Sequence, residues 1–185
     1  MHRVFVYGTL KRGQRNNAWL TNPAHGASQF VDAATTRDPY PLIAYPPFSI
    51  PFLLDAINHP NAKRVHGEIY DVNDAMLASL DMLEFEGDWY SRSPIDVVRT
   101  SDGTTTSTTS CMTYMLRDFD SRLLDMNFVD SYDEAKAPVL RPRQPSQVVD
   151  VMMETRKKRL GEDATEVRRN LSERMEALLR KIQKK

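Results

Sequence analysis

The stretch RVFVYGTLKRGQ, residues 3–14, begins with a short apolar run that stops at Tyr7, Gly8 and Thr9 before the chain turns basic. A continuous apolar run of this length is typical of a strand buried on both faces, and it is too short for a helix. The spacing from Gly8 to Gly13 imitates a phosphate-binding loop, but Gln and Arg follow where Lys and Ser or Thr are required. The stretch therefore predicts a buried first strand that ends in a loop of another kind.

Length and composition bound the class of protein. The chain has 185 residues, 41% of them hydrophobic, which suits one domain with an appendage or two small domains. The net charge is zero, so composition favours neither nucleic acid nor an acidic membrane surface as a partner. No run approaches the ~20 apolar residues of a membrane span, and the N-terminus has no signal-peptide core. We therefore expect a cytoplasmic protein.

The chemistry-bearing residues outside the opening stretch are few. One cysteine, Cys111, excludes internal disulfides, and it lies in an apparent strand, where a buried, inert thiol is expected. The histidines at positions 2, 25, 59 and 66 lack the spacing of metal ligands. No serine-nucleophile motif of the form G-x-S-x-G is present. The sequence therefore predicts no metal site.

Composition changes near residue 145. Residues 1–145 hold all 11 prolines, six of the seven glycines and every aromatic residue, whereas residues 146–185 carry 11 Lys or Arg against 7 Asp or Glu. We expect a turn-rich domain over 1–145 and a charged helical tail over 146–185, with two helical segments around Gly161. One apolar stripe follows helical spacing in the second segment, at Val167, Leu171, Met175, Leu178 and Ile182.

Two roles for this tail helix stay open. It spans barely two heptads, which is short for an isolated coiled coil. The first alternative is a solvated helix that packs on its own domain. The second is a helix that associates with another copy or binds a protein partner.

The pattern within residues 1–145 predicts mostly strands with one or two helices. Strands are expected at 4–7, 30–34, 52–54, 64–72, 91–100 and 111–116, and a helical turn at 16–21. The polar stretch 101–110 should connect the last two strands. Residues 38–52 contain five prolines, so an ordered irregular loop is expected there. The fold class is α+β, a small mixed β-barrel with few helices.

One helix in this domain carries a candidate catalytic group. Asn73 can cap it, apolar residues recur at 76, 77, 80 and 83, and Gly87 is expected to end the segment. Glu84 lies four residues after Leu80, so its side chain projects from the apolar face. Burial and the negative end of the helix dipole both raise the pKa of such a carboxyl. A carboxyl tuned in this way is suited to general acid–base catalysis.

Alternatives to a catalytic Glu84 stay open on these residues alone. The helix can end before Glu84, or Glu84 can pair with an arginine such as Arg92. Glu86 falls beyond the helix and is expected in solvent, although it is a second acid within two residues. Asp81 lies at the edge of the apolar face, where it suits a structural hydrogen-bond acceptor.

Several motifs in the same order resemble the gamma-glutamylcyclotransferase-like family. They are VFVYGTLKRGQ near the N-terminus, HGEIYDV before the helix, LDMLE within it and WYSR after it, joined by AHG, PYPL, IPFLL and DSYD. The resemblance covers residues 2–145 and favours the branch that acts on γ-glutamylamines. It implies a small mixed barrel with a cavity on one side, and a reaction that uses no metal or cofactor.

The resemblance also implies an activity and site residues. The α-amino group of a γ-glutamyl unit, such as that of γ-glutamyl-ε-lysine, attacks its own γ-carbonyl and yields 5-oxoproline and a free amine. Glu84 matches the family's catalytic acid/base. The implied substrate-binding residues are Tyr7, Gly8, Thr9, Leu10, Ile50, Pro51 and Tyr90, with Tyr132 a weaker candidate. The backbone N–H groups after the first strand would bind the substrate carboxylate or the oxyanion.

Two other functions remain open at this point. The substrate could be another γ-glutamyl compound, such as a γ-glutamyl amino acid. Alternatively, the domain could be a catalytically silent binding module whose tail does the work. An inward acid together with YGTL favours an enzyme that acts on a small γ-glutamyl molecule.

Overall fold

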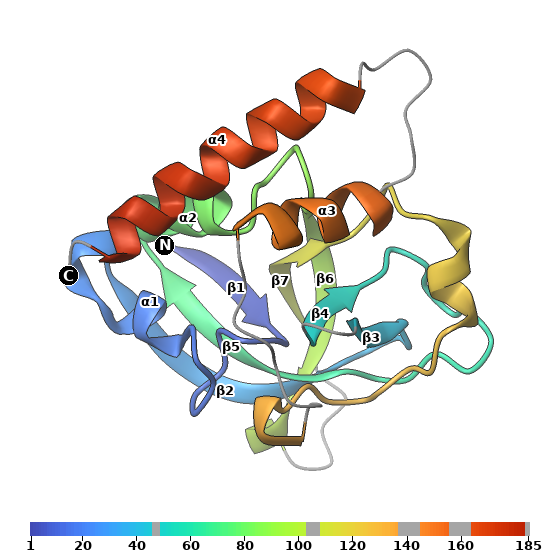
Figure 1. The fold of residues 1–185 in the computed structure, drawn as a ribbon. Coiled ribbons are helices and arrows are strands. Elements are labelled where there is room, and N and C mark those ends of the chain that lie inside the picture. Colours follow the sequence, from blue (N-terminus) through green and yellow to red (C-terminus); the bar gives the residue numbers. More distant parts are fainter. Residues whose placement is uncertain (46–48, 103–107, 137–144, 156–163, 184–185) are drawn as a thin grey trace.

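Five strands close into a barrel in the part of the chain that this computed structural model describes, residues 1–45, 49–102, 108–136, 145–155 and 164–183 (Figure 1). The strands are β1 (His2–Val6), β2 (Ser28–Thr36), β3 (Leu42–Tyr45), β4 (Ile50–Leu53), β5 (His66–Val72), β6 (Ser91–Arg99) and β7 (Thr108–Met115). The α-helices are α1 (Asn17–Thr21), α2 (Asp74–Leu83), α3 (Pro145–Thr155) and α4 (Ala164–Gln183). Short 3-10 helices lie at η1 (Pro23–His25), η2 (Thr100–Asp102), η3 (Ser121–Asp125) and η4 (Glu134–Lys136).

The barrel runs in the order β1-β5-β2-β6-β7 and closes where β7 meets β1. Its neighbours pair antiparallel except β1 and β7, which pair parallel with Val4 opposite Met112. The fold class predicted from sequence is confirmed. The polar stretch 101–110 does connect β6 and β7, but residues 108–110 already belong to β7, and residues 103–107 lie outside the described part.

The opening strand is buried on both faces, as its apolar run predicted. Val4 and Val6 pack into one apolar cluster, while Phe5 and Tyr7 pack into a second cluster on the other side. The chain leaves the strand at Tyr7, so the loop that follows starts from the rigid interior of the barrel. A loop anchored in this way can hold its backbone groups in fixed positions.

Helix α2 begins and ends close to its predicted positions. The Asn73 side chain accepts a hydrogen bond from the Met76 N–H at 2.9 Å, which caps the helix. The helix ends at Leu83 with Glu84 as its C-terminal cap, so Glu86 lies beyond it as expected. Phe85 follows the cap with its backbone in the left-handed conformation (φ 51°) and its side chain buried in the core, which prevents the helix from continuing.

The proline-rich segment is more regular than predicted. Instead of an irregular loop, residues 42–45 and 50–53 pair antiparallel as β3 and β4, a separate two-stranded sheet. Pro51 lacks an N–H, but a two-stranded sheet has only edge strands, so it tolerates a proline that a central strand would not. Residues 46–48 between the two strands lie outside the described part.

The tail forms two helices at the end of the barrel where α2 lies (Figure 1). Leu171 and Met175 of the predicted stripe are 2% and 8% exposed and join the apolar cluster of the barrel strands. This burial matches the first alternative, a helix packed on its own domain. Gly161 and the side chains of Leu178 and Ile182 lie outside the described residues.

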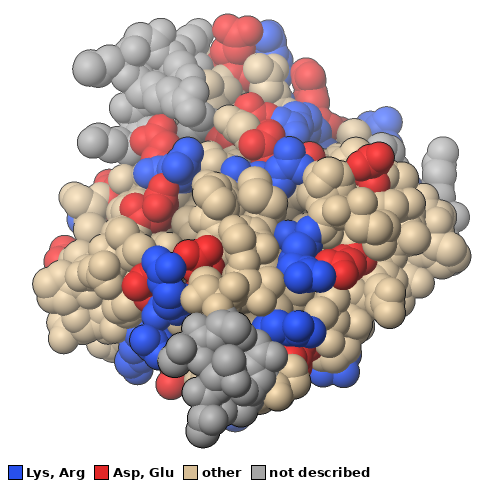
Figure 2. Space-filling view, turned by 180° about the vertical axis from the view of Figure 1, so that it is seen from behind, with Lys and Arg blue, Asp and Glu red and all other residues tan. Residues whose placement is uncertain are grey.

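The surface carries charges of both signs. Figure 2 shows basic and acidic side chains side by side on the face behind the view of Figure 1. Ion pairs link several of these charges, such as Arg3 with Asp71 at 2.9 Å. No helix among the described residues combines the length and apolar character needed to cross a membrane.

Candidate active site

Glu84 lies at the C-terminal end of α2 with its backbone N–H bonded to the Leu80 carbonyl at 2.9 Å. The residue keeps partial access to solvent, yet burial raises the pKa of its carboxyl to about 7. The carboxyl is therefore surrounded by protein, although the residue as a whole keeps some exposed surface. Among the described residues, its carboxyl forms no hydrogen bond or ion pair.

Arg92, the expected alternative partner of Glu84, is bound elsewhere. Its guanidinium lies 3.3 Å from the Asp81 carboxylate. Asp81 also accepts a hydrogen bond from the Tyr114 hydroxyl at 2.7 Å, so it is the structural acceptor that its position on α2 predicted. In the described part of the chain, Glu84 therefore has no paired cation that would lower its pKa.

Two buried tyrosines lie close enough to Glu84 for its negative charge to affect their pKa values. Burial, followed by the charge of Glu84, raises the pKa of Tyr7. Burial, the Asp81 carboxylate and then Glu84 raise the pKa of Tyr114. The Tyr7 hydroxyl donates to the Tyr114 carbonyl at 2.7 Å and not to Glu84. Both phenols remain protonated and bonded, so neither is available as a base at neutral pH.

The loop after β1 presents the three N–H groups that the sequence singled out. Among the described residues, the N–H groups of Gly8, Thr9 and Leu10 have no hydrogen-bond acceptor. Their other polar atoms are engaged, since the Thr9 hydroxyl accepts from the Asn16 amide at 2.9 Å and the Leu10 carbonyl accepts from the Asn17 amide at 2.9 Å. The loop is thus held through the Thr9 hydroxyl and the Leu10 carbonyl, which accept hydrogen bonds, while its three N–H groups are available to bind an anion.

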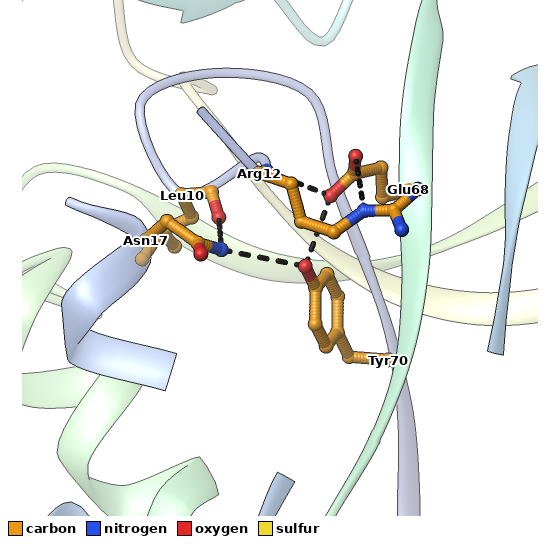
Figure 3. Close-up of polar contacts among 5 residues, drawn as sticks. All are labelled: Leu10, Arg12, Asn17, Glu68 and Tyr70. Atoms are coloured by element: carbon orange, nitrogen blue, oxygen red, sulfur yellow. Dashed lines mark hydrogen bonds and ion pairs between the residues drawn. The ribbon is translucent and has the colours of Figure 1, made fainter. Parts of the chain in front are cut away.

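A polar network braces this loop on β5 (Figure 3). The Glu68 carboxylate accepts from the Arg12 backbone N–H at 2.9 Å, from the Arg12 guanidinium at 3.1 Å and from the Tyr70 hydroxyl at 3.0 Å. The Asn17 amide joins Tyr70 at 3.4 Å to the Leu10 carbonyl. Burial and then the Glu68 charge raise the pKa of Tyr70 to about 12, so its hydroxyl remains a donor.

Strand β4 lies against the loop. A Cβ added to Gly8 would come within 2.7 Å of the Pro51 ring, so only glycine permits this approach. The Tyr90 hydroxyl donates to the Pro51 carbonyl at 3.0 Å, and the Tyr132 hydroxyl donates to the Ser49 carbonyl at 2.9 Å. Tyr90 thus holds the backbone of Pro51 itself, and Tyr132 holds that of Ser49, just before β4.

The predicted residues gather in one region, with differences in their roles. Ile50 is buried, and Tyr90 acts through the Pro51 carbonyl. Glu86 lies past the end of α2, and its backbone N–H bonds to the Asp81 carbonyl at 2.9 Å. Burial raises the pKa of the Cys111 thiol to about 12, as an inert cysteine requires. No cluster of metal-ligating side chains occurs among the described residues.

Sequence reasoning missed Tyr114 and the brace of the loop. Tyr114 lies 107 residues from Tyr7, and nothing in its local pattern marks it apart from any strand aromatic. Glu68 and Tyr70 carry a weak signal, because they alternate in HGEIYDV and so share one face of the strand.

Comparison with known proteins identifies the family of this fold and site. The family model described as "Gamma-glutamyl cyclotransferase, AIG2-like" matches residues 4–134, and the chain belongs to this family. The gamma-glutamylaminecyclotransferase of Homo sapiens is 35% identical over 154 residues, which cover 78% of this chain and 99% of that protein. Gamma-glutamylaminecyclotransferase C of Danio rerio is 38% identical over 133 residues, covering 71% of this chain and 86% of that protein.

A solved structure agrees with this assignment. The crystal structure of an AIG2-like protein from Mus musculus superposes with a TM-score of 0.69 at 30% sequence identity. The match covers 97% of the mouse chain but 78% of this one. The family model stops at residue 134, so both tail helices lie beyond it.

Proposed function

We propose that the protein is a γ-glutamylamine cyclotransferase that converts compounds such as γ-glutamyl-ε-lysine to 5-oxoproline and a free amine. Family membership and the names of its relatives support the reaction. One observation supports its assignment to this site: the Glu84 carboxyl at the end of α2 forms no ion pair with any described residue, and burial raises its pKa to about 7. We further propose that residues 1–145 form the catalytic domain and residues 146–185 an appended tail.

Glu84 supplies the proton transfers in this proposal. The substrate's α-ammonium group must lose a proton before its nitrogen can attack, and ionised Glu84 accepts that proton. The α-nitrogen then forms a bond to the γ-carbonyl carbon, and the bond from that carbon to the leaving amine breaks. The α-nitrogen loses a second proton as the ring closes. Glu84 passes both protons in turn to the leaving nitrogen, which departs as an ammonium group, so protons and electrons balance within one turnover. A pKa near the working pH suits a group that both accepts and donates.

The loop after β1 stabilises the negative charges of the substrate and of the transition state in this proposal. The carbonyl oxygen gains negative charge as the ring closes, and the substrate carboxylate is negative throughout. The N–H groups of Gly8, Thr9 and Leu10, which have no acceptor among the described residues, are suited to bind either charge. Because attack is intramolecular, holding the bent conformer between this loop and the Pro51 wall lowers the entropic part of the barrier.

The test is to incubate the full chain with γ-glutamyl-ε-lysine and, separately, with γ-glutamyl-alanine, and to measure 5-oxoproline. We expect product from the first substrate at a clearly higher kcat/KM than from the second. A preference for γ-glutamyl-alanine would assign the enzyme to γ-glutamyl amino acids. Binding without product from either compound would identify a silent binding module and overturn the proposal.

A further inference from the structure

The tail helices contact the segment that immediately follows Glu84. Phe85 is 3% exposed and belongs to the same apolar cluster as Leu171 and Met175 of α4. The guanidinium of Arg174, also on α4, lies 5.1 Å from the centre of the Phe85 ring and forms an ion pair with Asp88. Helix α4 therefore holds two points of the loop between α2 and β6.

The same loop is held from its other side by β4. The Trp89 ring contacts Phe52 edge to face, with centroids 5.4 Å apart, and the Tyr90 hydroxyl bonds to the Pro51 carbonyl at 3.0 Å. Residues 85–90 thus lie between the Pro51 wall of the candidate site and the tail helix. We call this segment the acid loop.

The backbone of the acid loop needs such support. Phe85 is a non-glycine residue in the left-handed region, a conformation that persists only where the surroundings hold it. Glu84 directly precedes it, so a change in the Phe85 backbone moves the Glu84 carboxyl. Because the matched family region ends at residue 134, this support comes from a part of the chain beyond it.

We propose that α4 clamps the acid loop and that Arg174 is a positioning residue for the cyclisation, because this clamp keeps the Glu84 carboxyl buried. This inference rests on the proposed function. Arg174 acts through Phe85 and Asp88 and does not touch the substrate. In this role the tail works within its own chain, through the buried stripe residues Leu171 and Met175.

The charged and titratable groups around Glu84 decide in which direction its pKa should change when Arg174 is removed. Tyr7 and Tyr114 are neutral, and Asp81 and Arg92 neutralise each other. Burial is what raises the pKa of Glu84. If Arg174 mattered only as a nearby positive charge, its removal would raise the pKa of Glu84 further. If it acts as a clamp, its removal lets water reach the carboxyl, and the pKa falls.

The variant to make is Arg174→Ala, with Arg168→Ala as the matched control. Arg168 lies on the same helix but pairs with Asp150 of α3, and among the described residues it forms no ion pair with the acid loop. We expect Arg174→Ala to lower kcat several-fold with a smaller change in KM, and to shift the acidic limb of the pH profile downward. Arg168→Ala should behave as the native protein, and Arg174→Lys should recover part of the loss.

A readout independent of turnover separates this inference from the proposed function. The Glu84 carboxyl can be titrated by NMR in protein with 13C-labelled glutamate, assigned with Glu84→Gln. A lower pKa of Glu84 in Arg174→Ala supports the clamp even if the native protein makes no 5-oxoproline, which would overturn only the proposed function. An unchanged or raised pKa in Arg174→Ala overturns the clamp, whatever the activity.

Discussion

Tyr7 and Tyr114 meet at the closing edge of the barrel, where the Tyr7 hydroxyl donates to the Tyr114 carbonyl at 2.7 Å. The Tyr114 hydroxyl in turn donates to Asp81 at 2.7 Å. Both phenols near Glu84 therefore donate their hydrogen bonds to other acceptors. Neither phenol stabilises the ionised Glu84 carboxylate by a hydrogen bond, so burial keeps the pKa of Glu84 raised, which is the property that the proposed reaction uses.

Replacing the acid tests its role directly. Glu84→Gln keeps the size of the side chain but can neither take nor return a proton, so we expect kcat/KM to fall by roughly 10²–10⁴-fold. Glu86→Gln is the matched control, because Glu86 lies beyond the end of α2. Steady-state formation of 5-oxoproline measures both. Activity that survives in Glu84→Gln but is lost in Glu86→Gln would reverse the assignment.

The pH dependence follows from the same carboxyl. Glu84 must be ionised to accept the first proton, so kcat/KM should rise with pH and level off above a midpoint near 7. An ordinary exposed glutamate would place that midpoint about two units lower or more. A profile of kcat/KM from pH 4.5 to 8.5 measures it. A midpoint below 5 would show that the base is not the buried carboxyl.

Glu84 is also expected to cost stability at alkaline pH. The folded state binds its proton more tightly than the unfolded state, so folding is favoured at low pH and this advantage is lost as pH rises from about 4.5 to 7. Glu84→Gln has no carboxyl to ionise and keeps this stability, a difference of about 3 kcal/mol at alkaline pH.

Thermal unfolding of both proteins measures this difference. The Tm of Glu84→Gln should exceed that of the native chain by several degrees at pH 8, while the two should agree near pH 4.5. Equal Tm values at pH 8 would argue that the carboxyl is fully solvated.

The contact between Gly8 and Pro51 predicts a binding defect. In Gly8→Ala the new Cβ would lie 2.7 Å from the Pro51 ring, so the wall must move away from the loop. We expect KM to rise with a smaller effect on kcat. Gly13→Ala is the control for the loop backbone, because it strains a positive φ (78°) but meets no atom within 4 Å. Similar KM values in the two variants would contradict a role for the Gly8–Pro51 contact.

The brace on β5 should matter for catalysis although it does not touch the acid. Glu68→Gln replaces one acceptor oxygen by a donor that faces Arg12, which loosens the loop. We expect kcat/KM to fall roughly 5–30-fold, corresponding to about 1–2 kcal/mol of lost positioning.

Asp71→Asn is the matched control for Glu68→Gln, because Asp71 forms an arginine pair on the same strand with Arg3 and not with the loop. The same assay of 5-oxoproline formation compares the two variants. Equal losses would indicate a general effect on the barrel and not on the loop.

Local patterns in the sequence determined much of this protein. The apolar run before Tyr7 predicted the buried strand, Asn73 predicted the start of α2, and helical spacing placed Glu84 inward, because each depends on neighbours within a few residues. The irregular loop expected over residues 38–52 was mispredicted, because residues 42–45 and 50–53 pair as β3 and β4. There the burial of side chains such as Ile43 and Phe52 outweighed the local signal of the prolines.

Only the tertiary structure decided what Glu84 contacts. Whether Arg92 pairs with Glu84 or with Asp81 depends on how β6 packs against α2, and the hydrogen bond from Tyr7 joins residues 107 positions apart. The packing of Arg174 against the acid loop likewise depends on how the chain folds back on itself. A sequence specifies the type and spacing of groups, but the pKa of a carboxyl depends on which atoms surround it, and that is settled by packing between distant segments.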